Sequence, residues 1–185
     1  MIITSDPFII TDILNKGGII AYPTEAVWGL GCDPKNQAAV IKLLNIKSRP
    51  MSKGMILVAG DDTHLAPWLK HLPITLQTKL LASYDSPTSW IVADQNISPN
   101  WIRGDHQSIA LRLSQHTGVQ ALCQAFNGCI VSTSANPAGL APALNMRQVL
   151  NYFNGQIDAV FDSPLGQAKQ PSQIKNLLDD QLIRQ

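Results

Sequence analysis

The feature that most constrains the fold is a series of short apolar segments separated by stretches with helical periodicity. Six segments of four or five residues suit buried strands better than helices, which need ten or more residues. They span residues 19–22, 55–59, 90–93, 109–113, 129–132 and 157–161. Because near-continuous apolar strands are typical of sheets covered on both faces, the pattern indicates an α/β chain.

The intervening stretches carry helix signals. Asp6 and Pro7 are typical of the start of a helix, and Gly17 is typical of its end. The residues between them place isoleucines on one face of that helix. Further helices are predicted over residues 36–46, 61–82, 117–126 and 145–153, with Pro67 and Pro73 as breaks or starts within 61–82, and the longest loop over 94–107. We therefore expect one domain over residues 1–185, with a twisted mixed sheet and helices on its faces.

Composition limits the classes of function. The charged fraction is 15% and the net charge is +1. We therefore do not expect a protein that coats nucleic acid, although this net charge allows a local basic patch. Three cysteines without CxxC spacing predict free thiols in a reducing compartment. No signal peptide is evident at the N-terminus, and the uncharged stretch 113–146 is too polar to span a membrane. We expect a cytoplasmic protein.

The first chemical motif is YPTEAVWGLG, which follows the apolar segment 19–22. It places Thr24 and Glu25 at the carboxyl end of a strand, the edge where open α/β sheets bind ligands. Gly29 and Gly31 would let the backbone come close to another group. A capped turn with a buried hydrogen bond explains the motif equally well.

The second motif places Lys47 and Arg49 before Pro50, where a helix must end. The two cations could simply complement the negative end of the helix dipole. Alternatively they form a polyphosphate clamp, with Lys as a mobile point charge and Arg as a bidentate fork.

The third motif is STSAN, residues 132–136, where a predicted strand leaves the sheet. Its hydroxyls and amide could hold phosphate or ribose oxygens, or could satisfy the backbone of their own turn. The scattered histidines make a zinc site improbable, and GxxxxGK[ST] and any readable nucleophile–base pair are absent.

The motifs PTEAVWGLG, KSRP, STSAN and PSQI, in this order over nearly the whole chain, resemble the YrdC-type family. The resemblance implies a twisted α/β sheet with a concave, positively charged ligand groove. It also implies a reaction in which L-threonine, bicarbonate or carbon dioxide, and ATP become threonylcarbamoyl-AMP and pyrophosphate. The adenylate would then feed a separate transferase complex that modifies tRNA.

The resemblance also implies roles for individual residues. Lys47 and Arg49 would be catalytic and would hold the ATP phosphates, with magnesium carried by those phosphates rather than by a protein metal site. The remaining ATP contacts would be Ser108, Ser134, Asn136, Pro142 and Arg184. The threonine contacts would be Thr24, Arg112, Ser132 and Ser172.

Some residues depart from the family pattern, chiefly the stretch 85–89, which lacks the family's usual glycine. Two other functions fit the same resemblance. One is a non-catalytic module that binds tRNA or double-stranded RNA in the same groove. The other is a related enzyme that uses a different amine or carbamoyl donor.

Overall fold

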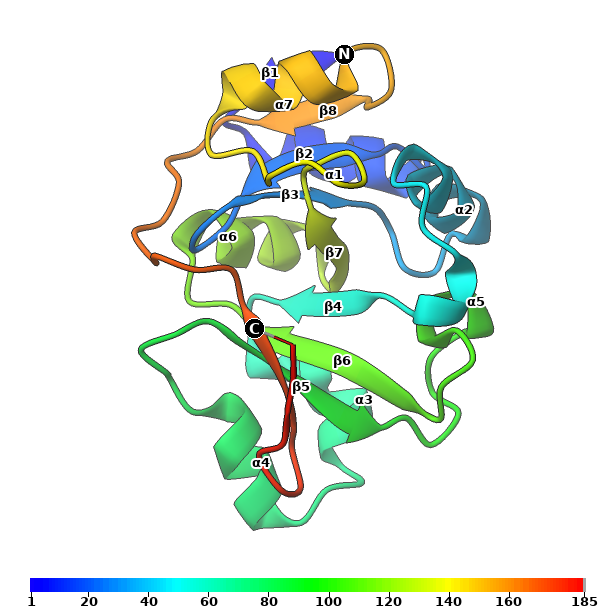
Figure 1. The fold of residues 1–185 in the computed structure, drawn as a ribbon, viewed down its shortest axis with the longest axis vertical. Helices are drawn as coiled ribbons and strands as arrows, with labels where there is room; N and C mark the ends of the chain where they lie inside the picture. Colours follow the sequence, from blue (N-terminus) through cyan, green and yellow to red (C-terminus); the bar gives the residue numbers. More distant parts are fainter. Residues whose placement is uncertain (185) are drawn as a thin grey trace.

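The protein forms one mixed β-sheet with helices packed on it, as the sequence predicts. The computed structural model describes residues 1–184, with the side chain of Arg184 outside the described part. In these residues ten strands pair in the order β1-β8-β2-β3-β7-β4-β6-β5-β9-β10. In Figure 1, α7 and β8 lie at one end of the long axis and α4 lies at the other.

The strands are β1 (Ile2–Thr4), β2 (Ile20–Pro23), β3 (Trp28–Gly31), β4 (Ile56–Ala59), β5 (Thr88–Ala93), β6 (Ser108–Leu113), β7 (Ile130–Ser134), β8 (Ala159–Phe161), β9 (Gln173–Asn176) and β10 (Leu182–Arg184). The helices are α1 (Pro7–Asn15), α2 (Gln37–Ile46), α3 (Ala66–Leu69), α4 (Ile74–Leu81), α5 (Asn100–Arg103), α6 (Thr117–Phe126) and α7 (Met146–Phe153). Two 3₁₀ turns span Met51–Lys53 and Asp62–Leu65.

Strand β7 joins the two halves of the sheet. Its first residues pair with β4 and its last residues pair with β3, both antiparallel. Strand β6 runs parallel to β4 on the far side, and β5 then pairs antiparallel with β6. The C-terminal hairpin of β9 and β10, red in Figure 1, extends this half of the sheet beside β5.

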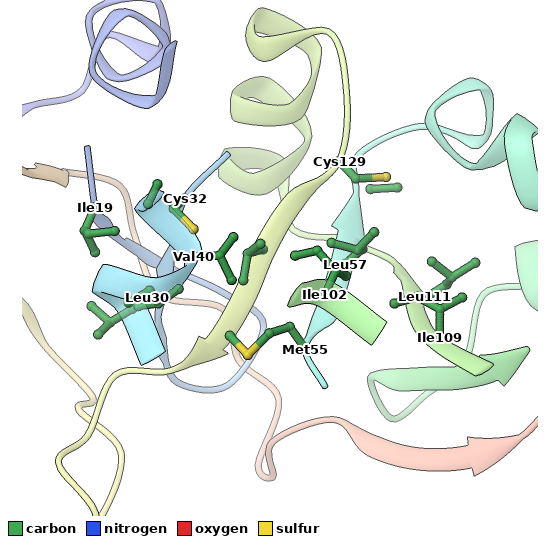
Figure 2. Close-up of a cluster of buried hydrophobic side chains, with 14 of the residues drawn as sticks. Ile19, Leu30, Cys32, Val40, Met55, Leu57, Ile102, Ile109, Leu111 and Cys129 are labelled. Atoms are coloured by element: carbon green, nitrogen blue, oxygen red, sulfur yellow. The ribbon is translucent and has the colours of Figure 1, made fainter. Parts of the chain in front are cut away.

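Alternation along the strands divides side chains between two faces. On one face lies the larger apolar cluster, part of which is drawn in Figure 2, and it includes Leu57 of β4, Val40 of α2 and Ile102 of α5. On the other face Ile20 and Val58 pack against α1 and α6 in a smaller cluster. The smaller cluster covers only part of that second face.

The helix start signals read from the sequence are confirmed. The Asp6 carboxylate accepts a hydrogen bond from the Phe8 N–H at the start of α1. The Asn36 amide oxygen accepts one from the Ala39 N–H at the start of α2. Each side chain satisfies a backbone donor that the first helical turn leaves unpaired.

Strand β3 is the main element that the sequence reading missed, because its WGLG sequence resembles a loop. A Cβ on Gly31 would lie 2.5 Å from the Val131 carbonyl oxygen and 2.9 Å from Tyr22 Cε1. Gly31 therefore allows close packing within the sheet. The groups that lie against it are the Val131 carbonyl and the Tyr22 ring, not a bound ligand.

Other differences are smaller. Residues 61–82 form a 3₁₀ turn, α3 and α4, and the predicted helix starts at the two prolines are confirmed, since Pro67 lies in the first turn of α3 and Pro73 directly precedes α4. Helix α5 interrupts the predicted loop over 94–107. The edge strands β1 and β10, and strand β9 beside β10, were not predicted. The cysteines are buried free thiols, as predicted. None of the helices in residues 1–184 is both long and apolar enough to cross a membrane.

Candidate active site

A pocket of about 600 Å³ lies on the part of the second sheet face that α1 and α6 leave uncovered. Residues Ser108, Ala110 and Arg112 of β6 form part of its floor, while Leu111 points to the other face and enters the larger apolar cluster. Ile109 belongs to that cluster and also lines the pocket. The turn after β2, the segment after α2, the segment after α5 and the C-terminal hairpin form its walls.

The three sequence motifs converge on this pocket. The predicted site residues that line it are Thr24, Lys47, Arg49, Ser108, Arg112, Ser132, Ser134, Asn136 and Ser172. Among the described residues Pro142 is not part of the lining, so its contact with a nucleotide stays a prediction without geometric support. The predicted Arg184 contact falls on a side chain outside the described part of the chain.

Lys47 links the second motif to the third. Its ammonium donates hydrogen bonds to the carbonyl oxygen of Ser134, 2.7 Å away, and to the side-chain oxygen of Asn136, 3.0 Å away. It also donates to the carbonyl oxygen of Asn136. The ammonium therefore points across the sheet to the end of β7, which a cation that only complements the α2 dipole would not do.

Burial, and secondarily the neighbouring charge of Arg49, lower the pKa of Lys47 to about 8. Arg49 itself donates to the carbonyl oxygen of Gly54 at 2.9 Å and to that of Lys53 at 3.3 Å. These bonds hold the guanidinium against the segment that leads into β4. Two cations are thereby fixed by backbone carbonyls beside the pocket, without a carboxylate partner in any of these bonds.

The SAN segment is internally bonded as well as linked to Lys47. The Ser134 hydroxyl donates to Asn136 Oδ1 at 2.6 Å, and the Asn136 amide donates to the Leu140 carbonyl oxygen at 2.8 Å. The turn therefore satisfies its own polar groups, and it also lines the pocket, while the binding of phosphate or ribose oxygens by this motif stays a prediction.

At another part of the pocket, Arg112 is 6% exposed, yet its Nε and Nη2 have no hydrogen-bond partner within residues 1–184. Nearby, the buried Ser89 hydroxyl donates to the Ser172 hydroxyl at 3.2 Å. The Thr24 hydroxyl donates to the Val27 carbonyl oxygen at 2.7 Å, which closes the turn between β2 and β3. A buried guanidinium with unused donors is suited to binding a carboxylate or phosphate.

Strand register separates the pocket into two ends. Ile56 of β4 pairs with Ala110 and with Ser132, so Ser108 and Ser134 lie toward one end of the strands. Val58 pairs with Arg112 toward the other end. Ser108 and Arg112 are four residues apart on one strand, which corresponds to about 13 Å. We call these the Ser108 end and the Arg112 end.

The lining is strongly positive although the chain is nearly neutral. The lining cations are Lys47, Arg49, Lys53, Arg103 and Arg112, and Glu25 is the one lining carboxylate among the described residues. The chain has 14 Lys and Arg residues against 13 Asp and Glu, so the cations are concentrated in the pocket. Such a lining favours a polyanionic ligand.

Several lining residues were not assigned from the sequence. Arg103 and His106 come from the predicted loop over 94–107, where nothing in the local sequence marks them. Glu25 was noticed within its motif but received no role. A second pocket of about 410 Å³, lined by the unusual 85–88 stretch, shares Glu25 and Arg112 with the first.

The described residues contain no group of three or more His, Cys, Asp and Glu side chains that could hold a metal ion. The pocket offers mainly cationic and neutral donors, which are suited to phosphate oxygens. A divalent cation there would fit as the companion of a bound polyphosphate, with water and phosphate as its ligands.

Comparison with known proteins places this geometry in a family. The sequence model of the Sua5/YciO/YrdC family, described as "Telomere recombination", matches residues 12–185. The chain is 44% identical over 173 residues to the threonylcarbamoyl-AMP synthase of Cellvibrio japonicus, covering 94% of this chain and 92% of the relative. It is also 44% identical over 172 residues to that of Pseudomonas aeruginosa, covering 93% and 92%.

Solved structures agree in fold. P. abyssi Sua5 complexed with L-threonine superposes with a TM-score of 0.86 at 22% identity, covering 95% of this chain but only 54% of that longer chain. E. coli YciO gives a TM-score of 0.83 at 21% identity, covering 100% and 94%. From the family match, the identity to curated relatives and the shared fold, we conclude that this chain belongs to the Sua5/YciO/YrdC family.

Proposed function

We propose that this chain makes threonylcarbamoyl-AMP and pyrophosphate from L-threonine, bicarbonate or carbon dioxide, and ATP. The synthases that resemble it at 44% identity carry this product in their names and are matched over 92% of their length. The observation that carries the proposal is the division of one pocket between carbonyl-anchored cations and a buried arginine with unused donors.

The Ser108 end fits the triphosphate. Lys47 and Arg49 would neutralise the phosphates and the charge that grows on departing pyrophosphate, which is the main electrostatic demand of phosphoryl and nucleotidyl transfer. Ser108, Ser134 and Asn136 would hold the rest of the nucleotide. Magnesium would be carried by the phosphates, because Glu25 is the single carboxylate among the described lining residues.

The Arg112 end fits the amino acid. Arg112 would pair with the threonine carboxylate, and Thr24, Ser132 and Ser172 would offer polar contacts around the rest of the molecule. The strand register separates Ser108 from Arg112 along β6, which leaves room for the two substrates side by side.

The chemistry needs positioning more than a protein nucleophile. The threonine ammonium loses a proton, the amine nitrogen adds to the carbon of carbon dioxide, and the nitrogen releases a second proton to solvent, which leaves the carbamate. A carbamate oxygen attacks the α-phosphorus, the bond from that phosphorus to the bridging oxygen breaks, and pyrophosphate leaves. Holding both reactants in one pocket supplies the proximity that a short-lived carbamate requires.

We also propose that the product serves tRNA modification, as the family resemblance implies. The adenylate would be passed to a tRNA threonylcarbamoyl transferase complex in the cytoplasm. Direct contact with tRNA or double-stranded RNA is compatible with the positive lining. Names of the curated relatives favour the catalytic function over a non-catalytic RNA-binding module.

Pyrophosphate release from ATP tests the proposal, measured with bicarbonate present and with or without L-threonine. Threonine-dependent release is expected. Release with a different amine but not with threonine would favour the related enzyme of altered substrate. No release with any amino acid from folded protein, together with salt-sensitive RNA binding, would favour the binding module.

A further inference from the structure

Glu25 and Arg112 form a buried pair of opposite charges that face each other without a hydrogen bond. Arg112 Nη2 and Glu25 Oε2 are 3.8 Å apart, and the two side chains are only 7% and 14% exposed. Within residues 1–184, Glu25 Oε2 and Arg112 Nε and Nη2 have no hydrogen-bond partner. Buried charges are normally satisfied, so this pair retains binding capacity of both signs.

The Glu25 carboxylate is held rigidly through its other oxygen. Glu25 Oε1 accepts hydrogen bonds from the Ser114 hydroxyl at 2.6 Å and from the Gln115 N–H at 3.2 Å. Burial raises the pKa of this carboxyl, but the Arg112 charge and the Ser114 hydrogen bond outweigh burial and leave it below its ordinary value. The group is therefore an oriented carboxylate at neutral pH.

The unused atoms define the ligand that would complete the pair. Arg112 offers N–H donors and requires an acceptor, while Glu25 Oε2 is an acceptor and requires a donor. An α-amino acid carries both, because its carboxylate and its ammonium are attached to the same carbon. A carboxylate alone would satisfy Arg112 but would lie beside the unpaired charge of Glu25.

We propose that Glu25 binds the α-ammonium group of the amino-acid substrate while Arg112 binds its carboxylate, so that the site selects a zwitterion. This proposal rests on the proposed function, since it extends the threonine subsite at the Arg112 end. It makes Glu25 a determinant of specificity that neither the sequence reading nor the relatives' names assign.

Calorimetric binding tests it without turnover. The probes are L-threonine and its α-hydroxy analogue, in which a hydroxyl replaces the ammonium. Wild-type protein is expected to bind threonine at least tenfold more tightly than the analogue. Glu25→Gln preserves the size of the side chain and an acceptor for Ser114 but removes the charge, and should reduce this preference to about twofold or less.

Asp158→Asn is the matched control, because it neutralises a carboxylate that is paired with Lys42 at 2.7 Å and lies outside the pocket lining. It should keep the wild-type preference. If Glu25→Gln does not fold, Glu25→Asp is the alternative. It keeps the charge but shortens the side chain by one methylene, which moves the carboxylate away from the ammonium, and it should lower the preference for threonine over the hydroxy analogue at least threefold.

Equal binding of both probes by wild-type protein would overturn the proposal, and so would an unchanged preference in a folded Glu25 variant. Failure of the proposed function is distinguishable. If threonine does not bind but another α-amino acid does, the substrate assignment fails, while the preference is still measurable with that amino acid and its hydroxy analogue.

Discussion

If Lys47 holds the ATP phosphates as proposed, its lowered pKa should make ATP binding depend on pH in a defined direction. Its folded value of about 8 compares with an ordinary value of 10.5, and burial is the main cause. Only the ammonium form carries the positive charge that attracts the phosphates. As the pH rises through 8, the free protein loses this proton, and ATP must then restore it in order to bind.

The magnitude follows from the titration. At pH 7 about nine tenths of Lys47 is protonated, and at pH 9 about one tenth. If ATP binds the ammonium form, its affinity should fall about tenfold over this interval, equivalent to about 1.4 kcal/mol, and binding at pH 9 should take up close to one proton.

Calorimetry of ATP binding between pH 7 and 9, in buffers of different ionisation enthalpy, measures both quantities. Lys47→Ala should bind ATP weakly with little dependence on pH, and its turnover should fall at least tenfold. Lys16→Ala, which removes an exposed lysine after α1, should behave as wild type. A flat wild-type affinity over this range, or the same slope in Lys47→Ala, would refute the reasoning.

Three further substitutions test other parts of the structure. Arg49→Ala should lower turnover at least tenfold, about 1.4 kcal/mol in transition-state stabilisation, with the fold retained by circular dichroism, and near-normal turnover would remove Arg49 from the mechanism. Thr24→Ala should raise the KM for threonine more than the KM for ATP, and an equal rise would contradict its placement at the amino-acid end. Gly31→Ala should destabilise the fold by about 1–3 kcal/mol in denaturant unfolding, because its Cβ would meet the Val131 carbonyl oxygen at 2.5 Å. Gly128→Ala, whose Cβ would meet nothing closer than 3.8 Å, is the control, and equal losses would show that packing at β3 is not the cause.

Local signals predicted the parts of the fold that local chemistry determines. Asp6 and Asn36 cap helices because their side chains reach backbone N–H groups two or three residues ahead. Strand β3 was missed because its two glycines are unfavourable for a strand in isolation. Its place in the sheet depends on Tyr22 and Val131, and Val131 is distant in the sequence.

The candidate site shows the same limit. Motif residues such as Lys47 and Ser134 could be chosen from the sequence because each lies where an element ends, Lys47 directly after α2 and Ser134 as the last residue of β7. The pairing of Glu25 with Arg112 could not, because it depends on the turn after β2 meeting the far end of β6. Arg103 likewise reaches the pocket through α5, a helix of four residues within a predicted loop.

The central claim is that one pocket joins threonine, a one-carbon unit and AMP. The most direct measurement supplies ¹³C-labelled bicarbonate, ATP and L-threonine and identifies the adenylate by mass spectrometry. We expect threonylcarbamoyl-AMP that carries the labelled carbon, with one pyrophosphate released for each product molecule. A threonyl adenylate without the label, or pyrophosphate release without threonine in the product, would contradict it.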